Sequence, residues 1–309
     1  MLTENLIKKL ENMKISSKLL LAVFVLTVFL VSSFQTIQPE TLKIQKGSHI
    51  ALIGSNLGSR MMNYGHFETE MHVRFPENSL FIRNMCDGGD TPGFRPHASR
   101  NLPWAFAGAE KFQTEYATNS SSEGHFDSPD QWLSMLKTDI IIAFFGYSES
   151  FQGKAGLENY KAELDAFIKY TLSQKYNQST PPQLAIVSPI AFEDLTSKYD
   201  LPNGVKENAN LLLYTNAMKA VAEQNSVLFV DAFTPSQKWY ENTPAFLTID
   251  GSQLNEEGYK KLSILLSDKV FGKFSAKAEA NRSLIHEAVM EKNWMWHNDI
   301  KVPDRKSVV

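Results

Sequence analysis

The stretch HIALIGSNLG, residues 49–58, holds a short apolar run that ends in glycine, followed by a polar turn. A run of this kind indicates a strand that is buried on both faces. Four further runs rich in apolar residues predict strands at 79–83, 138–145, 183–188 and 227–231. Apolar residues at helical spacing predict helices at 57–75, 158–174, 205–224 and 255–270. Strands that alternate with helices predict a three-layer α/β/α domain with a mainly parallel five-stranded sheet.

Two regions lie outside this alternation. Residues 87–137 are rich in Gly, Pro, Ser and Asn, and so long a loop inside a compact domain is usually functional or mobile. Residues 275–299 predict an additional helix that ends in an aromatic cluster around Trp294 and Trp296. We therefore expect the α/β domain at 39–274, followed by a C-terminal helix and tail at 275–309.

The N-terminal segment has the features of an export signal. Four lysines between Lys8 and Lys18 precede an apolar run at residues 19–31, and the small residues Ser32 and Ser33 follow it. A run of about 13 residues suits the core of a signal peptide and is short for a membrane span. We expect residues 1–38 to be a signal peptide or an uncleaved membrane anchor plus a linker. This segment would engage the membrane or the export machinery and make the protein periplasmic or extracellular.

The composition argues against several classes of function. The net charge is −3 at pH 7 and no basic stripe is present, so nucleic acid is not expected as a partner. The single cysteine, Cys86, excludes an intramolecular disulfide and a thiolate zinc site. The seven histidines show no HExxH or similar metal spacing. The sequence therefore predicts neither a metal nor a cofactor.

Four polar blocks stand out, at Gly54–Gly58, Asn84–Thr91, Phe145–Ser150 and Asp250–Tyr259; the first three follow predicted strands and the fourth leads into the predicted helix at 255–270. In a parallel sheet, ligands bind beyond the carboxyl ends of the strands, where such blocks meet. Together the blocks resemble, in order and context, the signature blocks of the SGNH/GDSL hydrolases. The resemblance implies the flavodoxin-like SGNH hydrolase fold. It also implies the activity of that family, which is hydrolysis of acyl or acetyl esters on carbohydrate or lipid.

The resemblance locates the catalytic positions as well. The nucleophilic serine of the family corresponds to Asn56, and an amide lacks the hydroxyl that attacks an acyl carbon. Ser55 lies one position early, where the family has aspartate, and is the alternative nucleophile. The histidine base corresponds to Gln253, which cannot take a proton near neutral pH. Asp250 matches the aspartate of the family.

The positions that bind the oxyanion in the family are partly kept. Gly89 matches the glycine whose N–H binds the oxyanion, and Ser148 replaces the asparagine whose side chain donates to it. Loss of one such donor typically lowers the rate about 10²–10³-fold. Asn56 and Gln253 are polar, like the residues that they replace. The pattern therefore predicts a degenerate active site that still binds a ligand.

A closer resemblance rests on five shorter runs, at 65–69, 75–77, 93–96, 144–146 and 188–193. They are similar to the SGNH-like module at the front of large exported proteins. In those proteins the module precedes propeller and c-type haem domains. No C-x-x-C-H motif occurs in this chain, so the resemblance implies no haem for it.

The leading hypothesis is a binding or accessory module for a small molecule or a glycan, with a carbohydrate or its acyl groups as the ligand. The candidate ligand-binding residues are Gly54, Asp90, Arg95, His97, Trp104, Gly146, Tyr147 and Glu149.

Two alternatives remain open. The first is an active acyl-ester hydrolase with rewired residues. Its nucleophile would be Ser55 or Ser148 and its base His66 or His97, oriented by one of the acids Asp250 and Glu149. A serine oxygen within about 2.6–3.2 Å of an imidazole nitrogen would favour it. The second is a site for a hard cation, formed by the carboxylates of Asp87, Asp90, Glu149 and Asp250.

Overall fold

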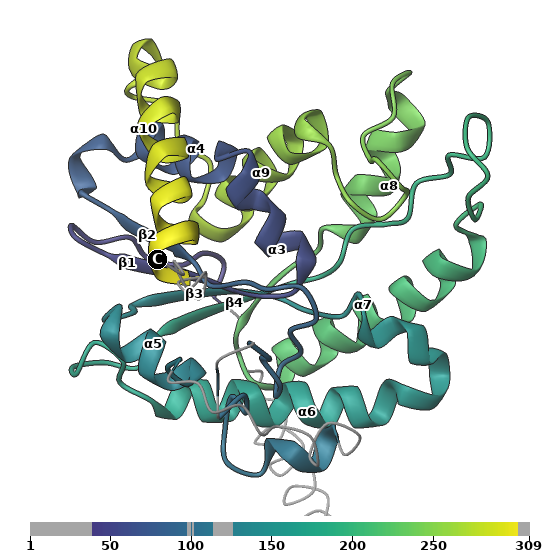
Figure 1. The fold of residues 1–309 in the computed structure, drawn as a ribbon, viewed down its shortest axis with the longest axis horizontal. Coiled ribbons are helices and arrows are strands. Elements are labelled where there is room, and N and C mark those ends of the chain that lie inside the picture. Colours follow the sequence, from purple (N-terminus) through teal and green to yellow (C-terminus); the bar gives the residue numbers. More distant parts are fainter. Residues whose placement is uncertain (1–38, 98–99, 101, 114–125, 302–309) are drawn as a thin grey trace, which may run out of the picture. The chain divides into compact units, whose positions relative to one another are not determined.

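The computed structural model describes residues 39–97, 100, 102–113 and 126–301 (Figure 1). The predicted signal peptide or anchor and the end of the C-terminal tail lie outside the described residues. Within the described ranges, no helix combines the length and the apolar character needed to cross a bilayer.

The sheet contains five parallel strands in the order β2-β1-β3-β4-β5, which confirms the predicted three-layer α/β fold. The strands are β1 (His49–Gly54), β2 (Phe81–Asn84), β3 (Ile140–Phe144), β4 (Gln183–Val187) and β5 (Leu228–Val230). The order reverses its direction between β1 and β3. In open parallel sheets this reversal is where the connections diverge and leave a crevice for a ligand.

Helices cover both faces of the sheet (Figure 1). One face carries α3 (Asn56–Arg60), α4 (His66–Arg74), α9 (Glu256–Phe271) and α10 (Arg282–Met295). The other face carries α5 (Pro129–Met135), α6 (Gly153–Ser173) and α7 (Val205–Gln224), and α8 (Phe233–Asn242) follows β5. Short 3-10 turns lie at Met61–Asn63, Pro76–Asn78, Ala109–Phe112, Glu149–Gln152 and Glu279–Asn281, and a π-helical turn lies at Trp296–Lys301.

The apolar core has one layer on each face of the sheet. Within β1, Ile50 and Leu52 pack toward α4 and α9, whereas Ala51 and Ile53 pack toward α6 and α7. This alternation follows from the two-residue period of a strand. Because both faces are buried, the strand reads as a continuous apolar run, and this is why it could be recognised in the sequence.

The helices differ from the sequence-based predictions in several places. The single helix predicted at 57–75 is divided, because Gly65 adopts φ +63° and caps the start of α4. The predicted loop at 87–137 contains α5, whose start is fixed by a capping box formed by Ser128 and Gln131. The helix α8 had not been predicted.

The C-terminal helix α10 packs on α4 through ion pairs. Arg282 Nη1 lies 2.8 Å from Glu70 Oε2, and Lys292 Nζ lies 2.7 Å from Glu68 Oε2. Both acids are buried, and each also has a partner within α4, Arg74 for Glu70 and His72 for Glu68, so the cations of α10 add a second partner to each carboxylate. The helix begins at Arg282, seven residues after the start predicted from the sequence, as 282 − 275 = 7.

Candidate functional site

A cavity of about 140 Å³, lined by both polar and apolar side chains, lies where the sheet reverses its order, at the carboxyl ends of the strands. Its walls come from α3 and from the loops that follow β3 and β4 and precede α9. The lining residues are Asn56, Leu57, Arg60, Tyr147, Pro189, Ile190, Ser252, Gln253 and Tyr259. The structure thus brings together Asn56 and Gln253, although they lie 197 positions apart in the chain.

The turn after β1 places Asn56 in this cavity. Gly54 has φ +108°, and a Cβ atom there would lie 2.1 Å from the carbonyl oxygen of Phe144. Only glycine allows the chain to turn this close to β3. Ser55 donates its N–H to the same Phe144 oxygen at 2.7 Å, and its side chain is buried, with 3% of the residue exposed. The buried position of Ser55 does not suit a nucleophile.

The carboxylate of Asp250 is engaged by its own turn. Its Oδ1 atom accepts hydrogen bonds from the Ser252 N–H at 2.9 Å, the Ser252 hydroxyl at 3.0 Å and the Gln253 N–H at 2.8 Å. These bonds hold the backbone of Gln253 so that its side chain lines the cavity. In this structure Asp250 shapes a loop.

A buried acid after β4 anchors the same loop. The carboxylate of Glu193 accepts hydrogen bonds from the Leu247 N–H and from the N–H and hydroxyl of Thr248. The Glu193 N–H in turn donates to the Gly251 carbonyl at 2.8 Å. In the sequence, Glu193 belonged only to a run of resemblance, and its role as an anchor was missed.

Tyr147 forms one wall of the cavity and Ser148 lies next to it. Burial raises the pKa of Tyr147, and a side-chain hydrogen bond with Ser252 partly offsets this effect. The Tyr147 ring packs edge-on against Phe151, with the ring centroids 5.2 Å apart. Ser148 is half-buried and is not among the lining residues, and Gly89 is exposed on the loop after β2 with φ +90°. The two oxyanion positions therefore do not line this cavity.

Arg60 also lines the cavity, and no motif had indicated it. It lies at the end of α3, one helical turn after Asn56. Its guanidinium lies beside the hydroxyl of Tyr259, which donates to the Leu57 carbonyl at 3.0 Å. Burial raises the pKa of Tyr259, and the neighbouring charge of Arg60 opposes this rise.

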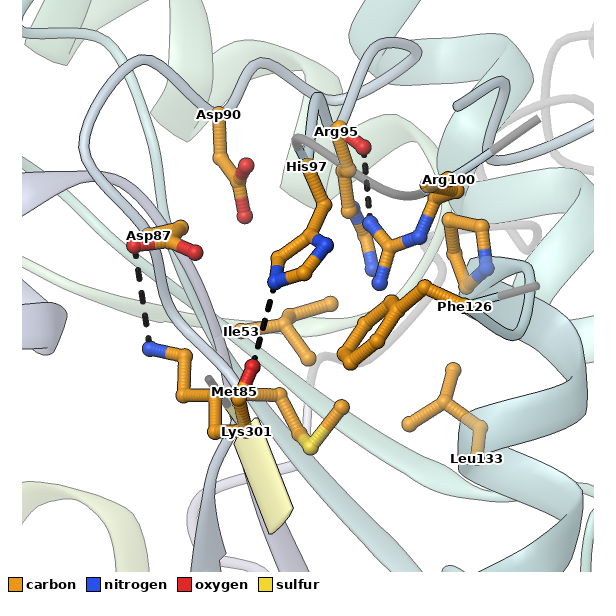
Figure 2. Close-up of a pocket in the computed structure, with 11 residues that line it drawn as sticks. Ile53, Met85, Asp87, Asp90, Arg95, His97, Arg100, Phe126, Leu133 and Lys301 are labelled. Carbon is orange, nitrogen blue, oxygen red and sulfur yellow. Dashed lines mark hydrogen bonds and ion pairs between the residues drawn. The ribbon is translucent and has the colours of Figure 1, made fainter. Parts of the chain in front are cut away.

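Asp90 and Arg95 lie in a different and smaller cavity, of about 20 Å³ (Figure 2). Both residues are buried, with 2% and 5% exposed, and burial raises the pKa of Asp90 well above its ordinary value. Arg100 and Lys301 line the same cavity, and His97 bonds the carbonyl of Lys301 there. Asp90, Arg95 and His97 thus lie apart from Tyr147, which lines the larger cavity.

Glu149 lies in the core between the sheet and α6. Its Oε2 atom accepts the N–H of Gly146 at 3.0 Å, and burial raises its pKa to about 8. Gly146 has φ +97°, and a Cβ atom there would lie 2.8 Å from the sulfur of Met218. Gly146 and Glu149 therefore shape the turn after β3 from inside and do not line the cavity.

The rewired hydrolase would need a serine hydroxyl that bonds a histidine ring. Among pairs of described residues, no serine hydroxyl bonds an imidazole nitrogen. His66 lies 3.5 Å from Glu256 in a groove between α4 and α9, and His97 lies in the small cavity with Asp90. The predicted cation site is not assembled either, since no group of three or more acids, histidines or cysteines in the described ranges is placed to hold an ion.

Searches with the sequence find no matching protein-family model and no matching curated protein. Solved structures do match. A catalytic mutant of an acetylxylan esterase from Geobacillus stearothermophilus aligns over 75% of this chain and 98% of its own, with a TM-score of 0.52 and 14% identity. A second mutant of that esterase aligns over 76% and 100%, with a TM-score of 0.51 and 14% identity.

A GDSL-like lipase from Parabacteroides merdae aligns over 74% of this chain and 98% of its own, with a TM-score of 0.50 and 12% identity. These likenesses establish the fold predicted from the motif blocks, so the chain has the SGNH/GDSL hydrolase fold. The resemblance to the front module of multidomain exported proteins stays a prediction.

Proposed function

We propose that this chain is a binding module for an acylated carbohydrate, built on the SGNH/GDSL hydrolase fold and lacking hydrolytic activity. One observation carries the proposal: the residues at the nucleophile and base positions, Asn56 and Gln253, line one cavity as neutral amides. Neither amide makes a side-chain hydrogen bond within the described part of the chain, so both are available to a ligand.

The chemistry of the cavity suits a sugar that carries an acyl group. Each carboxamide offers two N–H donors and one acceptor oxygen, which match sugar hydroxyls and an ester carbonyl. Leu57 and Ile190 supply apolar surface for a methyl group or a ring face. The volume of about 140 Å³ is below the roughly 300–1,000 Å³ of pockets for drug-sized ligands, which favours one ring or one substituent. Acetylated xylan, which the name of the matched esterase gives as its substrate, belongs to this class of ligand.

The same geometry opposes catalysis. Asn56 has no hydroxyl to attack the ester, and Gln253 has no basic nitrogen to take a proton. The alternative nucleophile, Ser55, is buried without an imidazole neighbour. Asp250, which matches the aspartate of the family's triad, accepts hydrogen bonds from the N–H groups of Ser252 and Gln253 in its own turn.

The test combines binding and turnover on the full chain. Binding is measured by calorimetric titration with acetylated xylo-oligosaccharide and with its deacetylated form. Turnover is measured as release of acetate from the acetylated sugar and as release of p-nitrophenol from p-nitrophenyl acetate. We expect binding of the acetylated form without turnover. The Gln253→Ala variant should bind at least about tenfold more weakly, because a lost hydrogen bond to a fully desolvated ligand is worth about 1.4 kcal/mol.

The matched control is Gln224→Ala, an exposed glutamine at the end of α7, which should bind like the wild type. Turnover that disappears in Ser55→Ala would overturn the proposal and establish a rewired hydrolase.

We also propose that the module works outside the cytoplasm. The support is the basic leader and apolar run at residues 8–31, read from the sequence alone. Fractionation of cells that express the full chain tests this, and recovery in the cytosolic fraction would contradict it.

A further inference from the structure

The cavity holds a cation without an acidic partner. Among the described arginines, Arg74 and Arg282 form ion pairs with buried or exposed acids. Arg60 forms no ion pair with any described residue, yet it lines the cavity that holds Asn56 and Gln253. An arginine that faces a polar cavity without a carboxylate is a ready site for an anion.

The guanidinium of Arg60 is held in place by its surroundings. Its Nε atom is buried and has no hydrogen-bond acceptor among the described residues. The Tyr259 hydroxyl donates to the Leu57 carbonyl, so its oxygen is free to accept from Arg60. The Tyr259 ring is itself stacked on Tyr64, with the ring centroids 5.1 Å apart. A buried N–H without an acceptor destabilises the protein unless a ligand supplies the acceptor.

The rest of the lining favours an anion over a cation. No aspartate or glutamate is among the lining residues of this cavity. Asp250 of the adjoining loop does not line the cavity, and its Oδ1 atom accepts the N–H groups of Ser252 and Gln253, although its charge still raises the pKa of Tyr147. Asn56, Gln253 and Tyr147 offer uncharged donors around the guanidinium. The cavity therefore presents one positive charge surrounded by hydrogen-bond donors.

We infer that the ligand of this cavity carries a carboxylate and that Arg60 binds that carboxylate, as in a uronic-acid sugar. This inference rests on the proposed binding function and narrows its substrate class to acidic carbohydrate. The planar guanidinium pairs two N–H groups with the two carboxylate oxygens, a geometry that a lysine cannot reproduce. The carboxylate belongs either to the sugar ring or to a dicarboxylic acyl substituent, because both place the same two oxygens before Arg60.

The first experiment needs no variant. The full chain is titrated by calorimetry with an oligouronate, with the methyl ester of that oligouronate, and with a neutral oligosaccharide that carries a succinyl half-ester. We expect the free acid to bind at least about tenfold more tightly than its neutral methyl ester. The affinity should also fall as sodium chloride is raised, because salt screens an ion pair that solvent reaches. Comparing the oligouronate with the succinylated sugar identifies the source of the carboxylate.

Variants then assign the effect to Arg60. We expect Arg60→Gln to lose the preference for the free acid, so that the acid and its methyl ester bind with about the same affinity. Arg60→Lys keeps the charge and loses the paired geometry, so its affinity should lie between the two. The control is Lys206→Gln, an exposed lysine in the first turn of α7, which should retain the full preference. Thermal unfolding of each variant checks that the contact with Tyr259 is not required for folding.

The outcomes separate the two proposals. Equal affinity for the acid and its methyl ester would overturn the carboxylate inference and leave the binding module standing. Acetate release from an acetylated sugar would instead overturn the binding module, whatever the charge preference. A preference for the acid that persists in Arg60→Gln would also refute the inference, because the anion would then bind elsewhere.

Discussion

Replacing Glu149 with glutamine should change how the stability of this protein depends on pH. The carboxyl group is buried in the core, and its Oε1 atom has no hydrogen-bond partner among the described residues. Burial, and to a smaller extent the neighbouring carboxyl group of Glu163, together raise its pKa to about 8. The folded protein therefore keeps Glu149 protonated at neutral pH, whereas the unfolded chain ionises it.

The sign of the effect follows from this difference. The folded-state pKa is about 8 and the ordinary value is 4.5, so the folded state binds the proton more tightly. The contribution of Glu149 to stability is complete below about pH 4.5 and declines as the pH rises to about 8. Between these values each pH unit lowers the free energy of unfolding by about 1.4 kcal/mol, which amounts to about 5 kcal/mol over the whole window.

Urea unfolding at pH 5, 6, 7 and 8 measures this contribution. We expect the free energy of unfolding of Glu149→Gln to rise relative to that of the wild type by about 1.4 kcal/mol with each pH unit, because glutamine does not titrate. Buried acids that do not interact with Glu149, such as Asp90, titrate in both proteins, and their effects cancel in the difference. Glu241→Gln, at an exposed position in α8, is the control and should show no such gain. Parallel curves for Glu149→Gln and the wild type would refute the reasoning.

Three further predictions concern the site and its supports. Gly54→Ala should lower the free energy of unfolding in urea by at least about 3 kcal/mol, because the new Cβ atom would overlap β3. The control is Gly47→Ala, also at positive φ but in open space, which should lower it by only about 1 kcal/mol. The double variant Asn56→Ser with Gln253→His should release p-nitrophenol from p-nitrophenyl acetate above the wild-type background, since the two positions share a cavity; no gain would contradict that placement. Cys86 should react with a thiol reagent only after unfolding, because it is buried and burial raises its pKa; rapid labelling of the folded protein would contradict this.

The sequence was most informative where local chemistry determines the structure. The strands β1 and β3 are buried on both faces, so continuous apolar runs marked them. The joint placement of Asn56 and Gln253 followed from the motif blocks and the parallel sheet, and no spacing argument alone could have supplied it. The break at Gly65 was missed because the polar residues on both sides have ordinary helical propensity.

The rest depended on contacts distant in the chain. Arg60 falls within the helix predicted at 57–75 and belongs to no motif block, and only the packing of α9 places Tyr259 beside it. Glu149 was expected to face a ligand because it follows β3. The bond from the Gly146 N–H instead turns its carboxyl group into the core. A single sequence carries no signal for either outcome, because both depend on tertiary packing.

The turn at Asp250 affects how mutational maps of this fold should be interpreted. A saturation scan selected only for folded protein would report few tolerated residues at position 250, since among side chains of the same length and shape only asparagine retains an oxygen that could accept the N–H groups of Ser252 and Gln253. Such a map would place a strong constraint on the position that the motif blocks match to the aspartate of the triad. An observer who equates intolerance with chemistry would then assign catalysis to a residue whose measurable task is to close a loop.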